Sequence, residues 1–466
     1  MSEPSETYDL AVIGGGSGGY AAARTSASAG LRTAVIEGGT DVGGLCILRG
    51  CMPTKALLQA AEVLHQCRRA GTWGIRVEEA SFNFAKVMAR KDSLIKEFAD
   101  YRREQLGSGR FDFVRAQARF ADPHTLALND GRRIAAKHFV IATGSVVAPP
   151  ALRGLKDVGF ITSDEALSLK KLPRSLIVLG GGAVAIELAQ FFARFDVKVS
   201  LIQRSEHVLK QFDTDAGAEL EKVFQREGIE VFTGTRLLNA RKFANLKEVS
   251  FEHRGETRRV GAEEILFALG RVPNTLSLGL ETAGVAVDGL RIVTDDRMRT
   301  SASHIFAAGD CTGPHEIVHI AIQQGEIAVS NILKPSNPRR MDYRLLTSVV
   351  FTEPQAAHVG LTEKAALAQG VPCLVASYPF NDHGKSLIME AKDGFVKLLA
   401  NPVTGEILGG SCVGPLGGEL IHEIVAAMHK RMTVQELAAM PHYHPTLAEI
   451  WSSPAEELAE KVMGSV

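Results

Sequence analysis

Two cysteines, Cys46 and Cys51, lie five residues apart within the segment 43–55. Five residues of regular helix advance about 7.5 Å along the axis, which exceeds the usual Cα separation of a disulfide. The two residues can therefore pair only across a distorted turn, for which Gly50 supplies the bend. Pro53 suits the first turn of a helix, which places Cys51 at a helix N-terminus, where the dipole favours a thiolate. We interpret the segment as a redox-active dithiol; a structural disulfide is the alternative.

A glycine-rich turn precedes this segment and has the spacing of a dinucleotide-binding turn. The apolar run 8–13 leads into Gly14, Gly16 and Gly19, then an alanine-rich stretch, a second apolar run and Glu37, 23 residues after Gly14. The order is a strand, a glycine turn, a helix, a strand and an acid. The glycines let the backbone approach a pyrophosphate, and the acid accepts hydrogen bonds from ribose hydroxyls. The alternative is a glycine turn without a ligand.

The same pattern returns 166 residues later. The apolar run 176–179 leads into Gly180, Gly182 and Ala185, followed by a helical stretch to Phe195 and a strand at 198–202. The sequence therefore predicts two dinucleotide sites.

The second site differs from the first at the end of its second strand. Gln203 stands in register with Glu37, so the second turn lacks the acid that would hold a free ribose 2′-hydroxyl and repel a 2′-phosphate. Arg204 and Lys210 are available to pair with that phosphate. This pattern favours NADP(H); solvated surface cations are the alternative.

The rest of the chain indicates one further domain. The runs 139–144, 265–270 and 305–310 read as buried strands that end in a glycine turn. From about Arg344 strand-like segments alternate with amphipathic helices, which suggests an α+β domain. We expect an α/β protein with two Rossmann-like dinucleotide-binding domains and a C-terminal α+β domain.

Composition limits the partners and the compartment. The 466 residues carry a net charge of −1 with both signs interspersed, which argues against nucleic acid and anionic membranes as partners. The six cysteines are few and mostly scattered, as in proteins of a reducing compartment. The N-terminal residues are polar, and no apolar run reaches transmembrane length. We expect a cytoplasmic enzyme.

Several motifs in the same order along the chain resemble those of the flavoprotein pyridine nucleotide-disulfide oxidoreductases of class I. The resemblance implies an FAD-binding domain in two parts, an inserted NAD(P)-binding domain and a C-terminal dimerisation domain. The expected boundaries are 1–147 and 275–343 for the FAD-binding domain, 148–274 for the NAD(P)-binding domain and 344–466 for the dimerisation domain. The chain would then act as a homodimer.

The resemblance also implies cofactor-binding residues. Asp310 would hold the ribityl chain of FAD, Ala118 would lie near the adenine, and His319 would lie on a helix under the flavin ring. The full FAD set comprises Gly14, Gly16, Ser17, Gly19, Glu37, Gly44, Lys55, Ala118, Thr143, Gly144, Asp310 and His319. The nicotinamide set comprises Gly180, Gly182, Ala185, Gln203, Arg204, Lys210 and Gly270.

Two further pairs complete the expected catalytic set. The segment 442–449 resembles the general base motif of the family: a carboxylate, Glu449, would orient His444, which takes a proton from a substrate thiol in the partner subunit's active site. Lys55 would lie beside flavin N5, paired with Glu187, and stabilise the reduced flavin. Taken alone, His444 could be a loop residue, and Lys55 and Glu187 could be surface charges.

Within the family, the base motif and the segment after Cys51 look most like dihydrolipoamide dehydrogenase. The residues between the cysteines resemble glutathione reductases, and the second nucleotide turn resembles mercuric reductases. We expect an FAD enzyme that passes electrons between NADP(H), or NAD(H), and a small-molecule or lipoyl-protein disulfide through Cys46 and Cys51. The alternatives are a glutathione or mercuric reductase-like enzyme and, in another class, a non-catalytic redox-sensing flavoprotein. The sequence does not name the disulfide or the direction of electron flow.

One motif points to a different chemistry. Residues 315–319 satisfy His-Glu-x-x-His, in which two histidines on one helical face bind zinc in metallopeptidases. Because the motif directly follows Asp310, we interpret it as part of the flavin turn. No second cysteine pair completes a metal cage around Cys46 and Cys51, so we expect no metal site.

Overall fold

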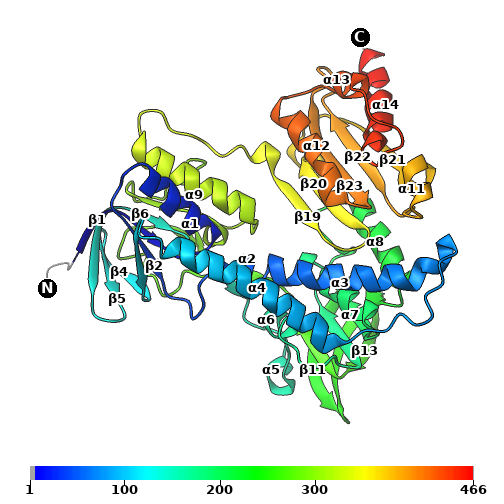
Figure 1. Cartoon of the computed structure of the whole chain (residues 1–466), viewed down its shortest axis with the longest axis horizontal. Coiled ribbons are helices and arrows are strands. Elements are labelled where there is room, and N and C mark those ends of the chain that lie inside the picture. Colours follow the sequence, from blue (N-terminus) through cyan, green and yellow to red (C-terminus); the bar gives the residue numbers. More distant parts are fainter. Residues whose placement is uncertain (1–5, 465–466) are drawn as a thin grey trace. The chain divides into compact units, whose positions relative to one another are not determined.

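The structure is a computed structural model that describes residues 6–464 (Figure 1). The chain forms two compact units. The first unit comprises Met1–Thr54, Met88–Pro149 and Gly270–Met341, and the second comprises Lys55–Val87, Pro150–Leu269 and Asp342–Val466. None of the helices in the described residues has the length and apolar character that a membrane crossing requires.

The first unit is built on a seven-stranded sheet in the order β3-β2-β1-β6-β5-β4, with β18 also paired to β6. Strands β1, β2, β3, β6 and β18 pair in parallel, whereas β4 and β5 form an antiparallel extension. The central strand β1 is buried on both faces over residues 10–13, as expected for a covered parallel strand. The strands are β1 (Glu6–Ile13), β2 (Thr33–Glu37), β3 (Asp112–Arg115), β4 (Ala118–Asp122), β5 (Thr125–Leu128), β6 (Arg133–Ile141) and β18 (Ile305–Ala307).

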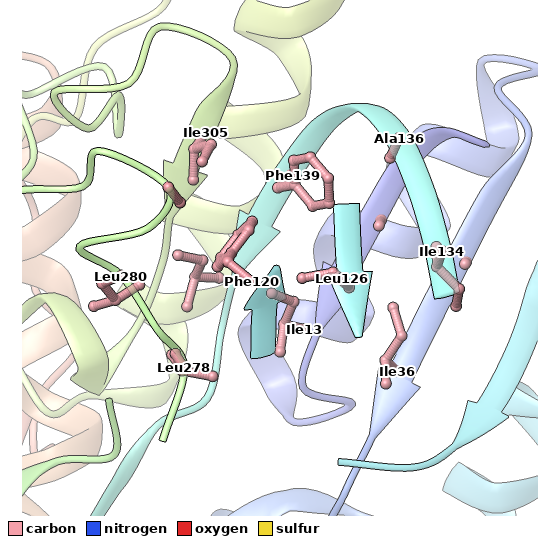
Figure 2. Close-up of a cluster of buried hydrophobic side chains, with 14 of the residues drawn as sticks. Ile13, Ile36, Phe120, Leu126, Ile134, Ala136, Phe139, Leu278, Leu280 and Ile305 are labelled. Atoms are coloured by element: carbon pink, nitrogen blue, oxygen red, sulfur yellow. The ribbon is translucent and has the colours of Figure 1, made fainter. Parts of the chain in front are cut away.

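Two helices of the first unit, α1 (Ser17–Ser28) and α9 (Val318–Leu333), pack side by side (Figure 1). A core of apolar side chains lies between the sheet and the segment that carries Leu278 and Leu280 (Figure 2). Phe120 and Phe139 meet edge to face in this core, with ring centroids 5.2 Å apart. The core makes the strand ends rigid supports for the turns that follow them.

Two short antiparallel pairs complete the first unit. Strand β7 (Ser145–Val147) pairs with β15 (Arg271–Pro273), and β16 (Val287–Asp288) pairs with β17 (Arg291–Ile292). The pairing of β7 with β15 joins the points at which the chain leaves the first unit and returns to it.

The second unit contains a four-stranded parallel sheet in the order β10-β9-β8-β14. A three-stranded antiparallel sheet, β11-β12-β13, accompanies it. The strands are β8 (Ser175–Leu179), β9 (Lys198–Ile202), β10 (Glu230–Phe232), β11 (Thr235–Phe243), β12 (Leu246–His253), β13 (Glu256–Ala262) and β14 (Glu264–Phe267). The helices of this region are α5 (Leu155–Val158), α6 (Ser163–Ala166), α7 (Ala183–Arg194) and α8 (Thr214–Arg226).

The last part of the chain forms a five-stranded antiparallel sheet, β19-β20-β23-β22-β21, within the second unit. Its strands are β19 (Thr347–Val350), β20 (Gln355–Gly360), β21 (Leu374–Pro379), β22 (Phe395–Ala400) and β23 (Ile407–Gly414). Its helices are α10 (Glu363–Gln369), α11 (Gly384–Ile388), α12 (Gly417–His429), α13 (Val434–Ala439) and α14 (Ser452–Met463). Helices α12 and α14 bury an apolar face against the sheet, with Trp451 fully buried at the start of α14.

Candidate functional site

The two cysteines flank a break between two helices. Cys46 lies in α2 (Gly44–Arg49), Cys51 is the first residue of α3 (Cys51–Arg69), and both are half-buried. The break falls at Gly50, where an added Cβ would lie 3.1 Å from Leu45 O. Thr54 closes the first turn of α3, because its N–H and its hydroxyl both donate to Gly50 O, at 3.2 and 2.7 Å. The local structure therefore has the distorted turn and the helix start that the sequence predicts.

An arginine that the sequence did not single out lies near Cys46. Arg102 belongs to α4 (Phe84–Leu106), and its guanidinium carbon lies 4.1 Å from the ring centroid of Tyr20. Burial lowers the pKa of Arg102, while electrostatic attraction to Tyr20 and Cys46 opposes that shift. Within residues 6–464, Nε and Nη1 of Arg102 are buried without a hydrogen-bond partner. A cation in this place favours a thiolate, and no sequence spacing links it to the cysteines.

The first glycine turn connects β1 to α1 and is closed by Glu37. The Glu37 carboxylate accepts hydrogen bonds from Gly15 N at 2.8 Å and from Gly39 N at 2.7 Å. Gly14 has a φ of +107°, and a Cβ added at Gly19 would lie 1.8 Å from Gly14 O, so only glycine fits this turn. Ser17 is the first residue of α1, whose N-cap is Gly16.

The cysteine segment approaches this turn. A Cβ added at Gly44 would lie 2.7 Å from Gly16 Cα, so the backbones of the two segments nearly touch. Ala118 begins β4, two residues after Ala116, whose N–H donates to Glu37 O at 3.2 Å. Gly44 therefore lies near the glycine turn, and Ala118 lies near the end of β2, although each is distant in the sequence from the element that it approaches.

Further predicted residues gather where β6 and β18 end. Ser145 Oγ donates to Asp310 Oδ2 at 2.7 Å, and Arg271 donates through Nε to Ser145 Oγ at 2.8 Å. Thr143 Oγ1 is buried and has no hydrogen-bond partner in the part of the chain that the structure describes. A buried hydroxyl without a partner marks a place where a polar ligand group fits.

Three further predicted residues, Gly144, Gly270 and His319, belong to the same region. Gly144 and Gly270 have φ values of +69° and +123°, and Gly270 O accepts a hydrogen bond from Ala148 N at 3.1 Å. His319 lies in the first turn of α9. His315 precedes α9, so the two histidines of His-Glu-x-x-His do not lie on one helical face, contrary to what the zinc motif requires.

The second glycine turn connects β8 to α7 and is closed by Gln203. A Cβ added at Gly181 would lie 2.9 Å from Gln203 Cδ, so this side chain packs directly on the turn. Gln203 is buried, and its Oε1 accepts a hydrogen bond from Arg204 N at 3.1 Å. Arg204 and Lys210 are exposed, and within residues 6–464 no ion pair engages either side chain.

The other residues of this turn complete the pattern. Gly180 has a φ of +118°, Gly182 is the N-cap of α7, and Ala185 is fully buried in the first turn of α7.

Lys55 and Glu187 form an ion pair within the second unit. Lys55 Nζ lies 2.8 and 3.1 Å from the two carboxylate oxygens of Glu187, whose side chain is only 3% exposed. Phe351 holds both partners: its N–H donates to Glu187 Oε1 at 2.9 Å, and its ring centroid lies 4.5 Å from Lys55 Nζ. Phe351 was not predicted, because only the fold brings the end of β19 to α7.

His444 and Glu449 form the predicted dyad. His444 Nδ1 lies 3.0 Å from Glu449 Oε2, and the His444 side chain is 77% exposed whereas that of Glu449 is 18% exposed. With Nδ1 directed to the carboxylate, Nε2 is left to exchange a proton with a substrate. A second, half-buried pair, His442 with Glu423 at 2.7 Å, lies close to this dyad in the sequence and was not predicted.

Comparisons with known proteins cover nearly the whole chain. Residues 8–325 match the family described as pyridine nucleotide-disulphide oxidoreductase, and residues 346–455 match the dimerisation domain of that family. The chain is 35% identical to the dihydrolipoyl dehydrogenase of Bacillus subtilis, with 95% of this chain and 96% of that protein covered. It is 32% identical to the mercuric reductase of Bacillus cereus, with 96% of this chain and 71% of that protein covered.

Solved structures agree with this relation. The HOCl-induced flavoprotein disulfide reductase RclA from Escherichia coli superposes with a TM-score of 0.85 at 27% identity, over 96% of this chain and 99% of that one. The fold is that of two nucleotide-binding domains followed by a C-terminal domain, as the sequence predicted. The cofactors of such a protein are FAD and a nicotinamide dinucleotide. The matches to both domains, over most of the chain's length, show that this chain belongs to the pyridine nucleotide-disulphide oxidoreductases, as a flavoprotein disulfide oxidoreductase.

Proposed function

We propose that the chain transfers electrons between NADP(H) and a dithiol/disulfide substrate of the lipoyl class through Cys46 and Cys51. The observation that carries the proposal is the break at Gly50, which sets Cys46 on one helix and Cys51 at the start of the next. A dithiol pair in a distorted turn is reducible, and a helix N-terminus favours the thiolate that exchange needs. The lipoyl class is proposed because dihydrolipoyl dehydrogenases are relatives over the full length of the chain.

The first unit has residues that fit FAD. Its glycine turn cannot accept a side chain at Gly19, so the start of α1 stays open to a pyrophosphate, and Glu37 and Asp310 offer carboxylates near the strand ends. The orphaned Thr143 hydroxyl offers a further polar contact. Flavin, when bound, supplies the two-electron chemistry that links the dithiol to the nicotinamide. We therefore propose the members of the predicted FAD set that lie in the first unit, from Gly14 to His319, as the residues that hold it.

The protein's own groups account for the proton and thiol steps in the direction of lipoyl oxidation. His444 Nε2 takes the proton of a dihydrolipoyl thiol, and the thiolate attacks Cys46 Sγ of the oxidised pair. An S–S bond forms between substrate and Cys46, and the Cys46–Cys51 bond breaks, which leaves Cys51 as a thiolate. The second substrate thiol then attacks the substrate sulfur bonded to Cys46, and its proton passes to the Cys46 thiolate as that bond breaks. The substrate leaves as a disulfide, and the two cysteines hold its electron pair.

Lys55 is proposed to stabilise negative charge on the reduced cofactor. Its ammonium is held by Glu187 and by the face of the Phe351 ring, so its position is defined by two contacts. A preorganised cation costs no reorganisation when charge develops. Phe351 belongs to this arrangement as the residue that orients both charged groups.

The coenzyme preference is proposed from the second glycine turn. Gln203 adds no negative charge where a ribose 2′-phosphate would lie, and Arg204 and Lys210 are exposed cations without an ion pair within the described residues. Each charge-assisted hydrogen bond to a phosphate contributes about 1.5–3 kcal/mol, or roughly tenfold or more in affinity. The same turn favours the second candidate function, an NADPH-dependent reductase of a glutathione-like disulfide or of mercuric ion.

We further propose that the chain acts as a homodimer whose subunits share active sites. The dimerisation domain of the family spans residues 346–455 and contains His444. The ring of His444 is 77% exposed, as a base that serves another subunit would be before assembly. We place the reaction in the cytoplasm, because the scattered cysteines are typical of a reducing compartment.

The experiment that tests the function compares wild type with Cys46→Ser and Cys51→Ser. Steady-state assays with lipoamide, glutathione disulfide and mercuric ion, each with both nicotinamides, identify the substrate. Both variants should lose disulfide turnover by about 1000-fold or more, because the thiol relay is broken. Flavin content should stay at the wild-type ratio. Either variant with undiminished lipoamide and glutathione disulfide turnover would refute the relay.

A mixing experiment tests shared active sites. Cys46→Ser and His444→Ala are each expected to be inactive, but a heterodimer of the two contains one intact site. Dissociation and reassociation of the mixed variants should restore part of the activity. Verified heterodimers without any recovered activity would contradict the proposal.

A further inference from the structure

Glu449 lies between two histidines, of which the sequence pattern identified only one. Its Oε2 lies 3.0 Å from His444 Nδ1, and its Oε1 lies 3.4 Å from His383 Nε2. His383 is the residue directly before α11, and its side chain is 6% exposed, whereas the His444 ring is 77% exposed. The carboxylate thus has a buried imidazole on one side and an exposed imidazole on the other.

The contact that Nδ1 of His383 makes determines which of the two ring nitrogens carries the proton. Nδ1 lies 2.8 Å from the hydroxyl oxygen of Ser386, which is fully buried in α11. If the hydroxyl donates to Nδ1, then Nε2 carries the proton and faces the Glu449 carboxylate. The opposite tautomer would direct a nitrogen lone pair at an anionic oxygen, so electrostatics favour Nε2–H.

The Nε2 atom of His383 needs a partner of this kind. It is buried, and within residues 6–464 it has no hydrogen bond of good geometry. The carboxylate oxygen Oε1 lies 3.4 Å away, and a shift of a few tenths of an ångström would make a hydrogen bond. A buried donor without an acceptor is destabilising, which favours this contact.

The surroundings keep His383 neutral. Burial lowers the pKa of His383, the carboxylate of Glu449 opposes that shift, and His444 adds to it when protonated. The ring of Phe380 packs against His383 edge to face, with centroids 6.4 Å apart. A neutral imidazole donates a hydrogen bond to Glu449 without neutralising its charge, so Oε2 of Glu449 remains an acceptor for His444 Nδ1.

We propose that His383 is a positioning residue for the base His444: it holds Oε1 of Glu449, so that Oε2 stays directed at His444 Nδ1. The order of contacts is Ser386 hydroxyl, His383, Glu449 and His444. This inference rests on the proposed role of His444 as the base for the substrate thiol. It adds a third residue, 66 positions before Glu449, to a dyad that lies within six residues of sequence.

The test replaces His383 in two ways. His383→Leu removes the donor, so Glu449 can rotate away from Nδ1 of His444 and the base loses its fixed orientation. We expect kcat for lipoamide-dependent turnover to drop about tenfold. His383→Gln restores an N–H near the position of Nε2 and should recover turnover to within about threefold of wild type.

Two further measurements separate positioning from damage to the fold. Reduction of ferricyanide by the nicotinamide-reduced enzyme requires no thiol deprotonation and should stay unchanged in both variants. Tyr378→Phe is the matched control, because it removes a hydrogen bond to Asp382 (3.1 Å), the residue before His383, and should leave both reactions unchanged. If His383→Leu does not fold, Ser386→Ala, which deletes the donor to Nδ1, should lower kcat for lipoamide-dependent turnover by a smaller amount and leave ferricyanide reduction unchanged.

The outcomes are decisive in each case. Folded His383→Leu and Ser386→Ala variants whose lipoamide turnover matches wild type would overturn the inference. So would an equal loss of lipoamide and ferricyanide activity in the folded variants, since that would indicate a structural role only. The proposed function has a separate test in Cys46→Ser and would survive either result.

Discussion

The two glycine turns share their backbone construction but differ in packing and in charge. In the first turn a Cβ at Gly19 would lie 1.8 Å from Gly14 O, whereas the equivalent residue of the second turn is Ala185, which is fully buried without such a clash. In the first turn Glu37 accepts hydrogen bonds from two backbone N–H groups, at 2.7 and 2.8 Å. In the second, Gln203 packs on Gly181 and accepts one, from Arg204 N.

This difference separates two tasks that one fold performs. A tight turn with an anion at the end of its second strand is suited to a permanently bound dinucleotide with a free ribose. A looser turn with a neutral amide and two exposed cations is suited to a coenzyme that binds and dissociates in each catalytic cycle. The cations fit the 2′-phosphate of the coenzyme that we propose. The distinction lies in side chains: Ala185 stands in place of Gly19, Gln203 stands in place of Glu37, and Arg204 and Lys210 add exposed cations.

The largest effect should come from adding one carbon to the tight turn. Gly19→Ala places a Cβ 1.8 Å from a backbone oxygen, so α1 must move away from β1 and the flavin site should be lost. We expect less than a tenth of the wild-type flavin per chain, measured by absorbance after denaturation. The matched change in the second turn, Ala185→Gly, should keep full flavin and cost only about 1 kcal/mol of stability. Normal flavin content in Gly19→Ala would contradict the comparison.

A smaller effect should follow from making the first turn resemble the second in charge. In Glu37→Gln only one side-chain oxygen remains, so Gly15 N or Gly39 N loses its acceptor and faces an NH₂ group. We expect the dissociation constant of FAD to rise about tenfold to a hundredfold, from the loss of about 1.5–3 kcal/mol. Reconstitution of flavin-free protein, followed by flavin fluorescence, measures it. An unchanged affinity would mean that Glu37 only closes the turn.

The smallest effect should be a change of coenzyme preference in the second turn. Wild type should have a lower KM for NADP(H) than for NAD(H). The double change Gln203→Glu with Arg204→Ala restores the acid and removes a cation, and should shift the ratio of kcat/KM toward NAD(H) by about tenfold or more. Lys222→Ala, at an exposed lysine of α8, is the control and should not shift the ratio. A wild type that prefers NAD(H), or a double variant with an unchanged ratio, would show that Arg204 and Lys210 are ordinary surface charges.

Much of the fold could be predicted because its signals are local. The runs before Gly14 and Gly180 correspond to β1 and β8, and the turn between Cys46 and Cys51 has its break at Gly50. Each of these features depends on residues within one or two turns of the backbone. The family resemblance extended the prediction to Lys55 with Glu187, which are 132 residues apart and form an ion pair.

The sequence by itself determined the fold class, the two nucleotide turns and the break between Cys46 and Cys51, because backbone geometry at close spacing leaves few alternatives, whereas the pairing of His444 with Glu449 came from the family resemblance. Only the tertiary structure decided which distant groups complete them: Arg102 near Cys46, Phe351 against Lys55 and Glu187, and His383 beside Glu449. These residues carry no local signal, because a buried cation, ring or imidazole is selected by the charge it meets across the fold. Their partners come together only when strands and helices from separate parts of the chain pack into one core.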